Sequence, residues 1–157
     1  IGQGFTLTNC LQLAVMTART VSNRVVMPRL ILTDEKPQFA HLGLQQKNIN
    51  AVMRGLEQVT RRGGTAAGSA INVNGARMGG KTGTSQVRSI SRAERESGVL
   101  TNEQLKWNMR NHGLFVGYAP TDKPKYAVCA ITEHSGGSGP AARTVAATMR
   151  ALLGDKK

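Results

Sequence analysis

The sequence has few aromatic and few acidic residues. Aromatic residues make up 4% of its 157 positions, and 9 acidic residues face 21 lysines and arginines, which gives a formal net charge of +12. Such a charge favours anionic partners, whether polyanions, acidic membrane surfaces or carboxylate-bearing substrates, without choosing among them. The basic groups at 61–62 and 88–95 have no aromatic residue beside them. Proteins that bind nucleic acids specifically often place aromatic side chains, on which bases stack, among their basic residues. Specific nucleic-acid binding is therefore not expected here.

Cysteines and long apolar runs are also scarce. Cys10 and Cys129 have neither metal-ligand spacing nor the density of a disulfide scaffold, so we predict two small buried hydrophobic residues. No apolar run approaches the ~20 residues that span a bilayer. The N-terminal residues 1–4 lack the basic and apolar segments of a secretory signal. We expect this chain to begin inside a longer protein.

Apolar periodicity predicts helices and strands that do not alternate along the chain. Helices are expected at 9–23, where Asn9 and Gln12 match a capping box, at 45–62 and at 140–153, where Pro140 suits the first turn. A glycine-rich strand is expected at 78–88, a short helix at 101–111 and a β-hairpin at 112–134. The first helix is apolar around most of its circumference and is expected to be buried. This order indicates an α+β fold with helices packed on an antiparallel sheet.

The stretch GARMGGKTGTSQV, at residues 75–87, fits two unrelated motifs. From Gly75 it reads G-x-x-x-x-G-K-T, a phosphate-binding loop, which must follow a buried strand and lead directly into a helix. Residues 69–74 are too polar for such a strand, and residues 83–85 are poor helix formers. From Lys81 it reads K-T-G, a carboxylate-binding strand motif. A nucleotide-binding module and a basic scaffold that only binds partners remain the alternatives to the K-T-G interpretation.

A K-T-G strand has chemistry suited to a peptide that ends in a carboxylate. Lys81 supplies a fixed positive charge, and Thr82 and Thr84 supply hydroxyl donors. Gly83 leaves the backbone open to a peptide that lies against it as an added strand. The backbone N–H of Thr84 would help to hold an oxyanion during acyl transfer.

The blocks around this motif carry a family resemblance along nearly the whole chain. They are, in order, IGQGFTLTNCLQLAVMTA, VMRGLEQVTRRGGTA, GGKTGTSQV and NHGLFVGYAPTDKPKYAVCAITEHSGGSGPA. Together they resemble the C-terminal part of the transpeptidase domain of class B penicillin-binding proteins, most closely the elongation type, penicillin-binding protein 2. One departure is Asn9-Cys10, where the family usually has Thr-Pro. The implied fold is a partial penicillin-binding transpeptidase fold, similar to serine β-lactamases.

The resemblance implies a serine-type D,D-transpeptidase that cross-links peptidoglycan stem peptides and is acylated by β-lactams. Within this chain Lys81, Thr82 and Gly83 would be the catalytic residues, and Thr82 and Thr84 would bind the carboxylate of the substrate or antibiotic. The family nucleophile lies in S-x-x-K and a second motif reads S-x-N, but no serine of this sequence fits either pattern. We expect the chain to be the second half of the domain and to be inactive alone.

The resemblance also implies a place in bacterial cell-wall synthesis and cell shape. The parent protein is expected at the periplasmic face of the inner membrane, anchored by a segment outside this chain, with a membrane glycosyltransferase as partner. Neither a cofactor nor a metal is expected. His41, His112 and His134 are far apart in the sequence and lack a paired carboxylate, so we interpret them as structural. A half-domain with unpaired strands is prone to self-association.

Overall fold

The computed structural model describes residues 6–154. Its sheet is antiparallel, with the strand order β1 (Gly79–Ser85), β2 (His112–Ala119) and β3 (Tyr126–Thr132). The helices are α1 (Cys10–Ser22), α2 (Gln46–Gln58), α3 (Arg92–Ser97) and α4 (Gly139–Leu152), with short 3₁₀ turns at η1 (Ala67–Ser69) and η2 (Trp107–Met109). The predicted α+β architecture, helices on an antiparallel sheet, is therefore confirmed.

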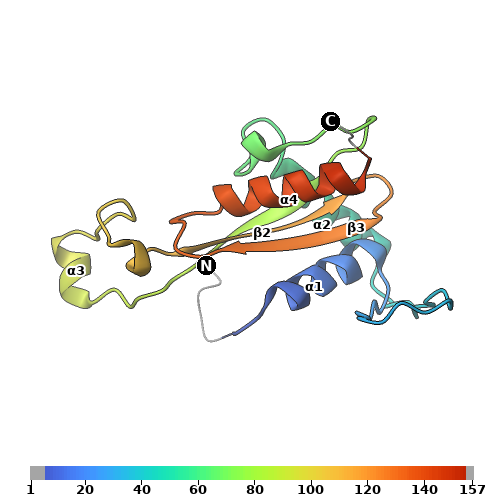
Figure 1. Cartoon of the computed structure of the whole chain (residues 1–157), viewed down its shortest axis with the longest axis horizontal. Coiled ribbons are helices and arrows are strands. Elements are labelled where there is room, and N and C mark those ends of the chain that lie inside the picture. Colours follow the sequence, from blue (N-terminus) through green and yellow to red (C-terminus); the bar gives the residue numbers. More distant parts are fainter. Residues whose placement is uncertain (1–5, 155–157) are drawn as a thin grey trace.

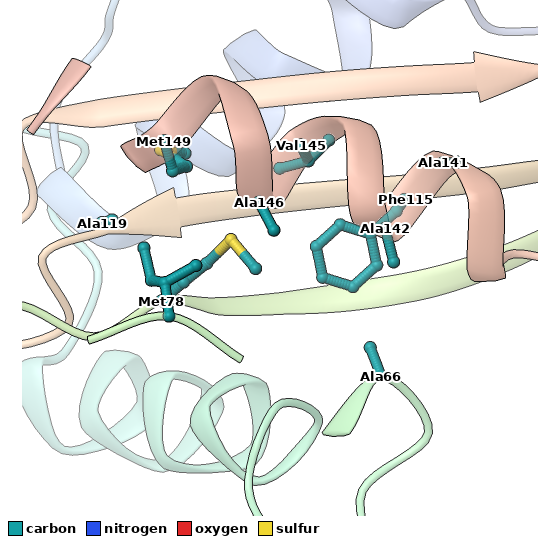
Figure 2. Close-up of a cluster of buried hydrophobic side chains, with 10 residues drawn as sticks. Ala66, Met78, Phe115, Ala119, Ala141, Ala142, Val145, Ala146 and Met149 are labelled. Carbon is teal, nitrogen blue, oxygen red and sulfur yellow. The ribbon is translucent and has the colours of Figure 1, made fainter. Parts of the chain in front are cut away.

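Different helices cover the two faces of the sheet (Figure 1). α4 packs on β2 and β3 from one side, and α1 packs on the same two strands from the other. Figure 2 shows the main core, which lies between α4 and the sheet. Its buried members are Ala66, Ile71, Met78, Phe115, Ala119, Ala141, Ala142, Val145, Ala146 and Met149. The small residues of α4 recur on one helical face, which lets this helix lie close to the strands.

α1 begins with the capping box that the sequence predicts. The Asn9 side chain accepts a hydrogen bond from the Gln12 backbone at 2.9 Å, and the Gln12 side chain accepts one from the Asn9 backbone at 3.0 Å. The expectation that this mostly apolar helix is buried is wrong for one side of it, because Leu11 and Met16 are 54% and 53% exposed. Among residues 6–154 the sheet covers one side of α1 and leaves these two side chains in solvent.

α2 and β1 are both shorter than predicted. α2 ends at Gln58 rather than residue 62, because the chain turns back and the Ala66 N–H bonds to the Val59 carbonyl at 2.8 Å. The turn passes through Gly64, where a Cβ would overlap the backbone carbonyls of Gln58 and Val59. β1 ends at Ser85 rather than residue 88, where the chain leaves the sheet toward α3.

The helix predicted at 101–111 is wrong. The Thr101 N–H does bond to the Gln104 side chain at 2.8 Å, but only a turn and η2 follow. The Asn102 side chain bonds instead to the Gly136 carbonyl and to the Asn111 N–H, both at 3.0 Å, which ties the segment to another part of the chain. The one helix in this connection is α3, which the sequence analysis missed.

The C-terminal half follows the predicted order. β2 and β3 form a hairpin with the register Gly113↔Thr132 through Ala119↔Tyr126, within the predicted range 112–134. α4 starts at Gly139 with Pro140 in its first turn, against a prediction of 140–153. In the part of the chain that the structure describes, no helix is both long and apolar enough to cross a membrane.

Candidate active site

The K-T-G motif occupies the centre of β1, which is an edge strand. β1 pairs with β2 along its whole length, from Gly79↔Tyr118 to Ser85↔His112. Among residues 6–154 no strand pairs with its other edge. That side is therefore the one at which a further extended segment can join the sheet.

Two glycines before the motif hold β1 close to the aromatic residues of β2. A Cβ at Gly79 would lie 2.7 Å from the Tyr118 ring, and one at Gly80 would lie 2.5 Å from both the Phe115 ring and the Val116 carbonyl. Tyr118 and Phe115 are fully buried. Burial, with a smaller contribution from Glu57, raises the pKa of Tyr118 to about 12. These rings form a rigid support beneath the start of the motif.

The residues of the motif alternate between the two faces of β1. Lys81 lies opposite Val116, and Thr82 lies opposite Phe115 on the α4 side. Lys81 is exposed, and its Nζ donates to the Thr82 carbonyl at 2.9 Å, so the ammonium lies against the strand backbone. The structure thus brings the Lys81 charge next to Thr82 although their side chains leave the strand on different faces.

The two motif threonines and the glycine differ in their surroundings. Thr82 is half-buried, and its hydroxyl lies 3.2 Å from the Thr65 hydroxyl. Thr84 is exposed and lies opposite Gly113 in the register. A Cβ at Gly83 would lie 3.3 Å from Leu114, so this position is tight toward the sheet.

Thr65 is a neighbour of the motif that sequence analysis missed. It follows the turn that ends α2, and its hydroxyl reaches β1 from there. The same connection has a second contact next to β1, because the buried Thr60 hydroxyl donates to the carbonyl of Met78, the residue before the strand. Nothing in the spacing of a lone threonine after two glycines indicates such a contact. It follows only from the fold.

A ring cluster lies beyond the far end of β1. His112, opposite Ser85 in the register, accepts a hydrogen bond at Nδ1 from the His134 N–H at 2.9 Å. The His134 ring is 4.6 Å from both the His112 and the Trp107 ring, and its Nδ1 is 3.1 Å from the Arg110 carbonyl. Two of the three histidines are therefore neighbours with structural hydrogen bonds. His41 forms an isolated bridge with Arg24 elsewhere.

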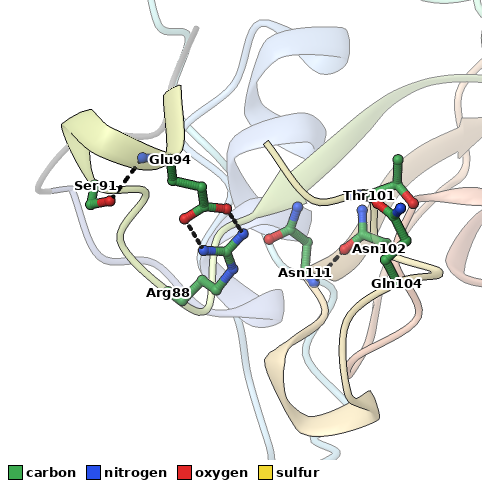
Figure 3. A network of polar contacts seen from close by, with 7 residues as sticks. All are labelled: Arg88, Ser91, Glu94, Thr101, Asn102, Gln104 and Asn111. Atoms are coloured by element: carbon green, nitrogen blue, oxygen red, sulfur yellow. Dashed lines mark hydrogen bonds and ion pairs between the residues drawn. The ribbon is translucent and has the colours of Figure 1, made fainter. Parts of the chain in front are cut away.

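The connection between β1 and β2 is stabilised by polar contacts (Figure 3). Arg88 and Glu94 form a two-pronged ion pair, with 2.7 Å between Arg88 Nη1 and Glu94 Oε2. The hydrogen bond and charge of Arg88 lower the pKa of Glu94. The Ser91 side chain accepts from the Glu94 N–H at 3.1 Å and caps α3. This pair therefore fixes α3 relative to the segment that leaves the candidate site.

The phosphate-loop interpretation of the same stretch does not fit this geometry. Asn74 and Gly75 have φ values of 51° and 84° and form a tight turn bridged by Val73 and Ala76. The Lys-Thr pair then lies inside a strand rather than at the start of a helix. Without a helix N-terminus after the glycines, the motif lacks the N–H groups that would receive a phosphate. Within residues 6–154 no three or more His, Cys, Asp and Glu side chains are grouped to hold a metal ion.

Comparison with known proteins identifies the class of protein to which this fold belongs. Residues 1–151 match the family described as Penicillin binding protein transpeptidase domain, and the chain belongs to that family. The first residues of the block IGQGFTLTNCLQLAVMTA, residues 1–5, fall within this match but lie outside the described residues.

Individual relatives point to the penicillin-binding protein 2 type. Peptidoglycan D,D-transpeptidase MrdA from Acinetobacter baumannii is 34% identical over 152 residues, covering 91% of this chain and 22% of that relative. PBP2 from Pseudomonas aeruginosa, solved in complex with WCK 5153, is 28% identical with a TM-score of 0.68, covering 99% of this chain and 33% of the other. PBP2 from Helicobacter pylori, solved in complex with MreC, has the same fold, with a TM-score of 0.76, 24% identity and coverage of 99% and 27%. The resemblance to class B penicillin-binding proteins is thus confirmed, and the chain spans 22% to 33% of these relatives.

Proposed function

We propose that this chain forms the K-T-G wall of the active site in a peptidoglycan D,D-transpeptidase of the penicillin-binding protein 2 type. The observation that carries the proposal is the open edge of β1, with the Lys81 ammonium and the Thr82 hydroxyl next to it. The activity named for the Acinetobacter relative supports the same conclusion.

In this proposal the donor stem peptide, or a β-lactam that mimics it, lies along the open edge of β1. Backbone hydrogen bonds hold it as an added strand, and the threonine hydroxyls at 82 and 84 bind its carboxylate. The Lys81 ammonium belongs to the hydrogen-bonded network that assists proton transfer, and the N–H of Thr84 stabilises the oxyanion. Gly83 lies between these groups and adds no side chain beside Leu114.

The serine nucleophile comes from a part of the protein outside this chain. Nucleophilic catalysis requires the attacking oxygen and its base within hydrogen-bond reach, and no serine here lies in S-x-x-K. This chain is therefore one C-terminal portion of a transpeptidase domain, inactive alone. The parent acts at the periplasmic face of the inner membrane together with a glycosyltransferase of the elongation machinery, as the family resemblance implies.

Covalent labelling by a fluorescent penicillin tests the proposal. The 157-residue chain should remain unlabelled after denaturing electrophoresis, whereas the full-length protein that contains it should be labelled. In the full-length protein Lys81→Ala should slow acylation on the order of 100-fold, because it removes a group that assists proton transfer. The measurement is the initial rate of labelling.

Lys123→Ala is the matched control, because it removes the same charge from an exposed turn between β2 and β3. It should label at the wild-type rate. Acylation of the chain by itself would contradict the assignment of the nucleophile. Equal labelling rates in the Lys81 variant and wild type would remove Lys81 from the mechanism.

A further inference from the structure

The two cysteines of the sequence are neighbours in the folded chain. Cys10 is the first residue of α1, and Cys129 lies in the centre of β3, opposite Val116. α1 packs across β3 (Figure 1). Val128 and Ala130 pack against the core under α4, so the side chain of Cys129 between them leaves β3 on the opposite face, where α1 lies and where it interacts with Cys10. Both thiols are free and half-buried. Residues about 120 positions apart thus meet with no third cysteine to compete.

The surroundings hold the two thiols in place from both sides. The reciprocal bonds between Asn9 and Gln12 fix the first turn of α1, which carries Cys10. Cys129 is fixed by the pairing of β3 with β2 on one side of its backbone. Because neither thiol lies on a mobile loop, their contact is a property of the fold rather than of a passing conformation.

We propose that Cys10 and Cys129 are a redox-active pair that closes to a disulfide and fastens the start of α1 to the sheet. The oxidant is a disulfide compound, either a small molecule or a protein dithiol in its oxidised form. This inference is independent of the proposed transpeptidase role, since it concerns neither β1 nor its ligand.

The reaction proceeds by two exchanges. Cys10 loses its proton to solvent and attacks one sulfur of the oxidant; the oxidant S–S bond breaks, and its other sulfur leaves as a thiolate. Cys129 then loses its proton and attacks the Cys10 sulfur, which forms the Cys10–Cys129 bond and releases the second oxidant thiolate. Together the two thiols of the chain lose two electrons to the oxidant. The two protons that they release are taken up by the two reduced sulfurs of the oxidant.

The order of attack follows from the environment of Cys129. Burial, followed by the hydrogen bond and charge interaction with Cys10, raises the pKa of Cys129 to about 12. Since the thiolate is the nucleophile, the raised pKa of Cys129 disfavours Cys129 as the first attacker. Once Cys10 carries the mixed disulfide it no longer offers its thiol to Cys129, so part of the cause that keeps Cys129 protonated disappears.

Oxidation of the purified chain with a glutathione redox buffer tests the proposal. After quenching with iodoacetamide, the intact mass should correspond to the loss of two hydrogens with no alkylation, and peptide mapping should show Cys10 joined to Cys129. The oxidised form should unfold at a temperature on the order of 10 °C higher than the reduced form, because the cross-link constrains the unfolded chain. A reductant should restore both thiols and the lower midpoint.

The same oxidation in denaturant is the control for geometry. There the internal disulfide should form to at least about a tenfold smaller extent, since the thiols are then separated by a long flexible loop. Cys10→Ser and Cys129→Ser should each retain one alkylatable thiol and show no shift in the midpoint. Two free thiols in the folded chain, a lasting glutathione adduct, or a disulfide between two chains would each overturn the proposal; none of these readouts requires the serine variants to fold.

Discussion

Gly80 shows how one residue without a side chain positions the K-T-G motif. Its Cα faces the Phe115 ring and the Val116 carbonyl, and a methyl group there would meet both at 2.5 Å. Phe115 is fully buried in the core under α4, and the Val116 carbonyl belongs to the paired backbone of β2. A larger residue at 80 must therefore push β1 away from β2.

Gly80→Ala should lower the free energy of unfolding by about 1–3 kcal/mol, the usual cost of overpacking a core. Urea denaturation of the chain gives this value directly. Gly55→Ala is the matched control: Gly55 lies inside α2 with no atom within 4 Å of an added Cβ. That variant should gain about 0.5–1 kcal/mol, because alanine is favoured over glycine in a helix interior. Equal effects of the two substitutions would contradict the contact assigned to Gly80.

The arrangement of residues that are close in the sequence could be predicted from the sequence. Contacts between residues that are distant in the sequence could not. The spacing of Lys81, Thr82 and Thr84 within one strand follows from the motif itself. The contact of Thr65 with Thr82 depends on how the chain turns after α2, and no local pattern encodes that turn. The cysteines, predicted as separate buried residues, are half-buried and adjacent, because α1 crosses β3. Such pairings arise from tertiary packing.

α3 begins at a local capping signal in the sequence. Ser91-Arg92-Ala93-Glu94 has the S-x-x-E spacing of a capping box, and the Ser91 side chain does bond to the Glu94 N–H. Thr101 and Gln104 have a similar spacing, yet no helix follows them, since Trp107 is 62% exposed and Met109 38%. A capping pattern marks where a helix can begin. Whether a helix then forms depends on an apolar face that packs against the rest of the protein, or on a strong ion pair that stabilises the helix.

The Arg88–Glu94 pair should make the stability of the α3 region depend on pH. Arg88 lowers the pKa of Glu94 in the folded chain, so the stabilisation is present above the unfolded value of about 4.3. It is lost as the pH falls through the lower folded pKa. Wild type should therefore be more stable than Glu94→Gln at neutral pH, and this difference should shrink toward about pH 2. Denaturant titrations across this pH range measure it.

Glu96→Gln is the control for this pH dependence. Glu96 pairs with Arg92 in solvent, where both side chains are largely exposed, and such pairs contribute little. The free energy of unfolding of this variant should change with pH in parallel with that of wild type. If Glu94→Gln behaved in the same way, α3 would not depend on the Arg88 contact.

At the scale of the whole molecule, the part of the chain at residues 6–154 forms a sheet of three strands with two outer edges. The outer edge of β1 is the one assigned to the substrate, and among residues 6–154 no strand pairs with the outer edge of β3. β3 has the sequence YAVCAIT, with neither the proline nor the lysine that usually protects an edge from pairing. The net charge of +12 opposes association at long range but is screened by salt. The balance between pairing at the β3 edge and repulsion between basic chains therefore depends on ionic strength.

The chain should self-associate through the β3 edge as its concentration and the salt concentration rise. Sedimentation velocity should show the average mass increasing under both conditions, because salt screens the repulsion between basic copies. Ile131→Lys should keep the chain monomeric, since lysine on an edge strand disfavours pairing. Leu152→Lys is the control, because it adds the same charge at a similar exposure, 43% against 39%, but lies at the end of α4. If both lysine variants suppressed association equally, added charge alone would explain the effect, and the β3 edge would not be the surface of contact.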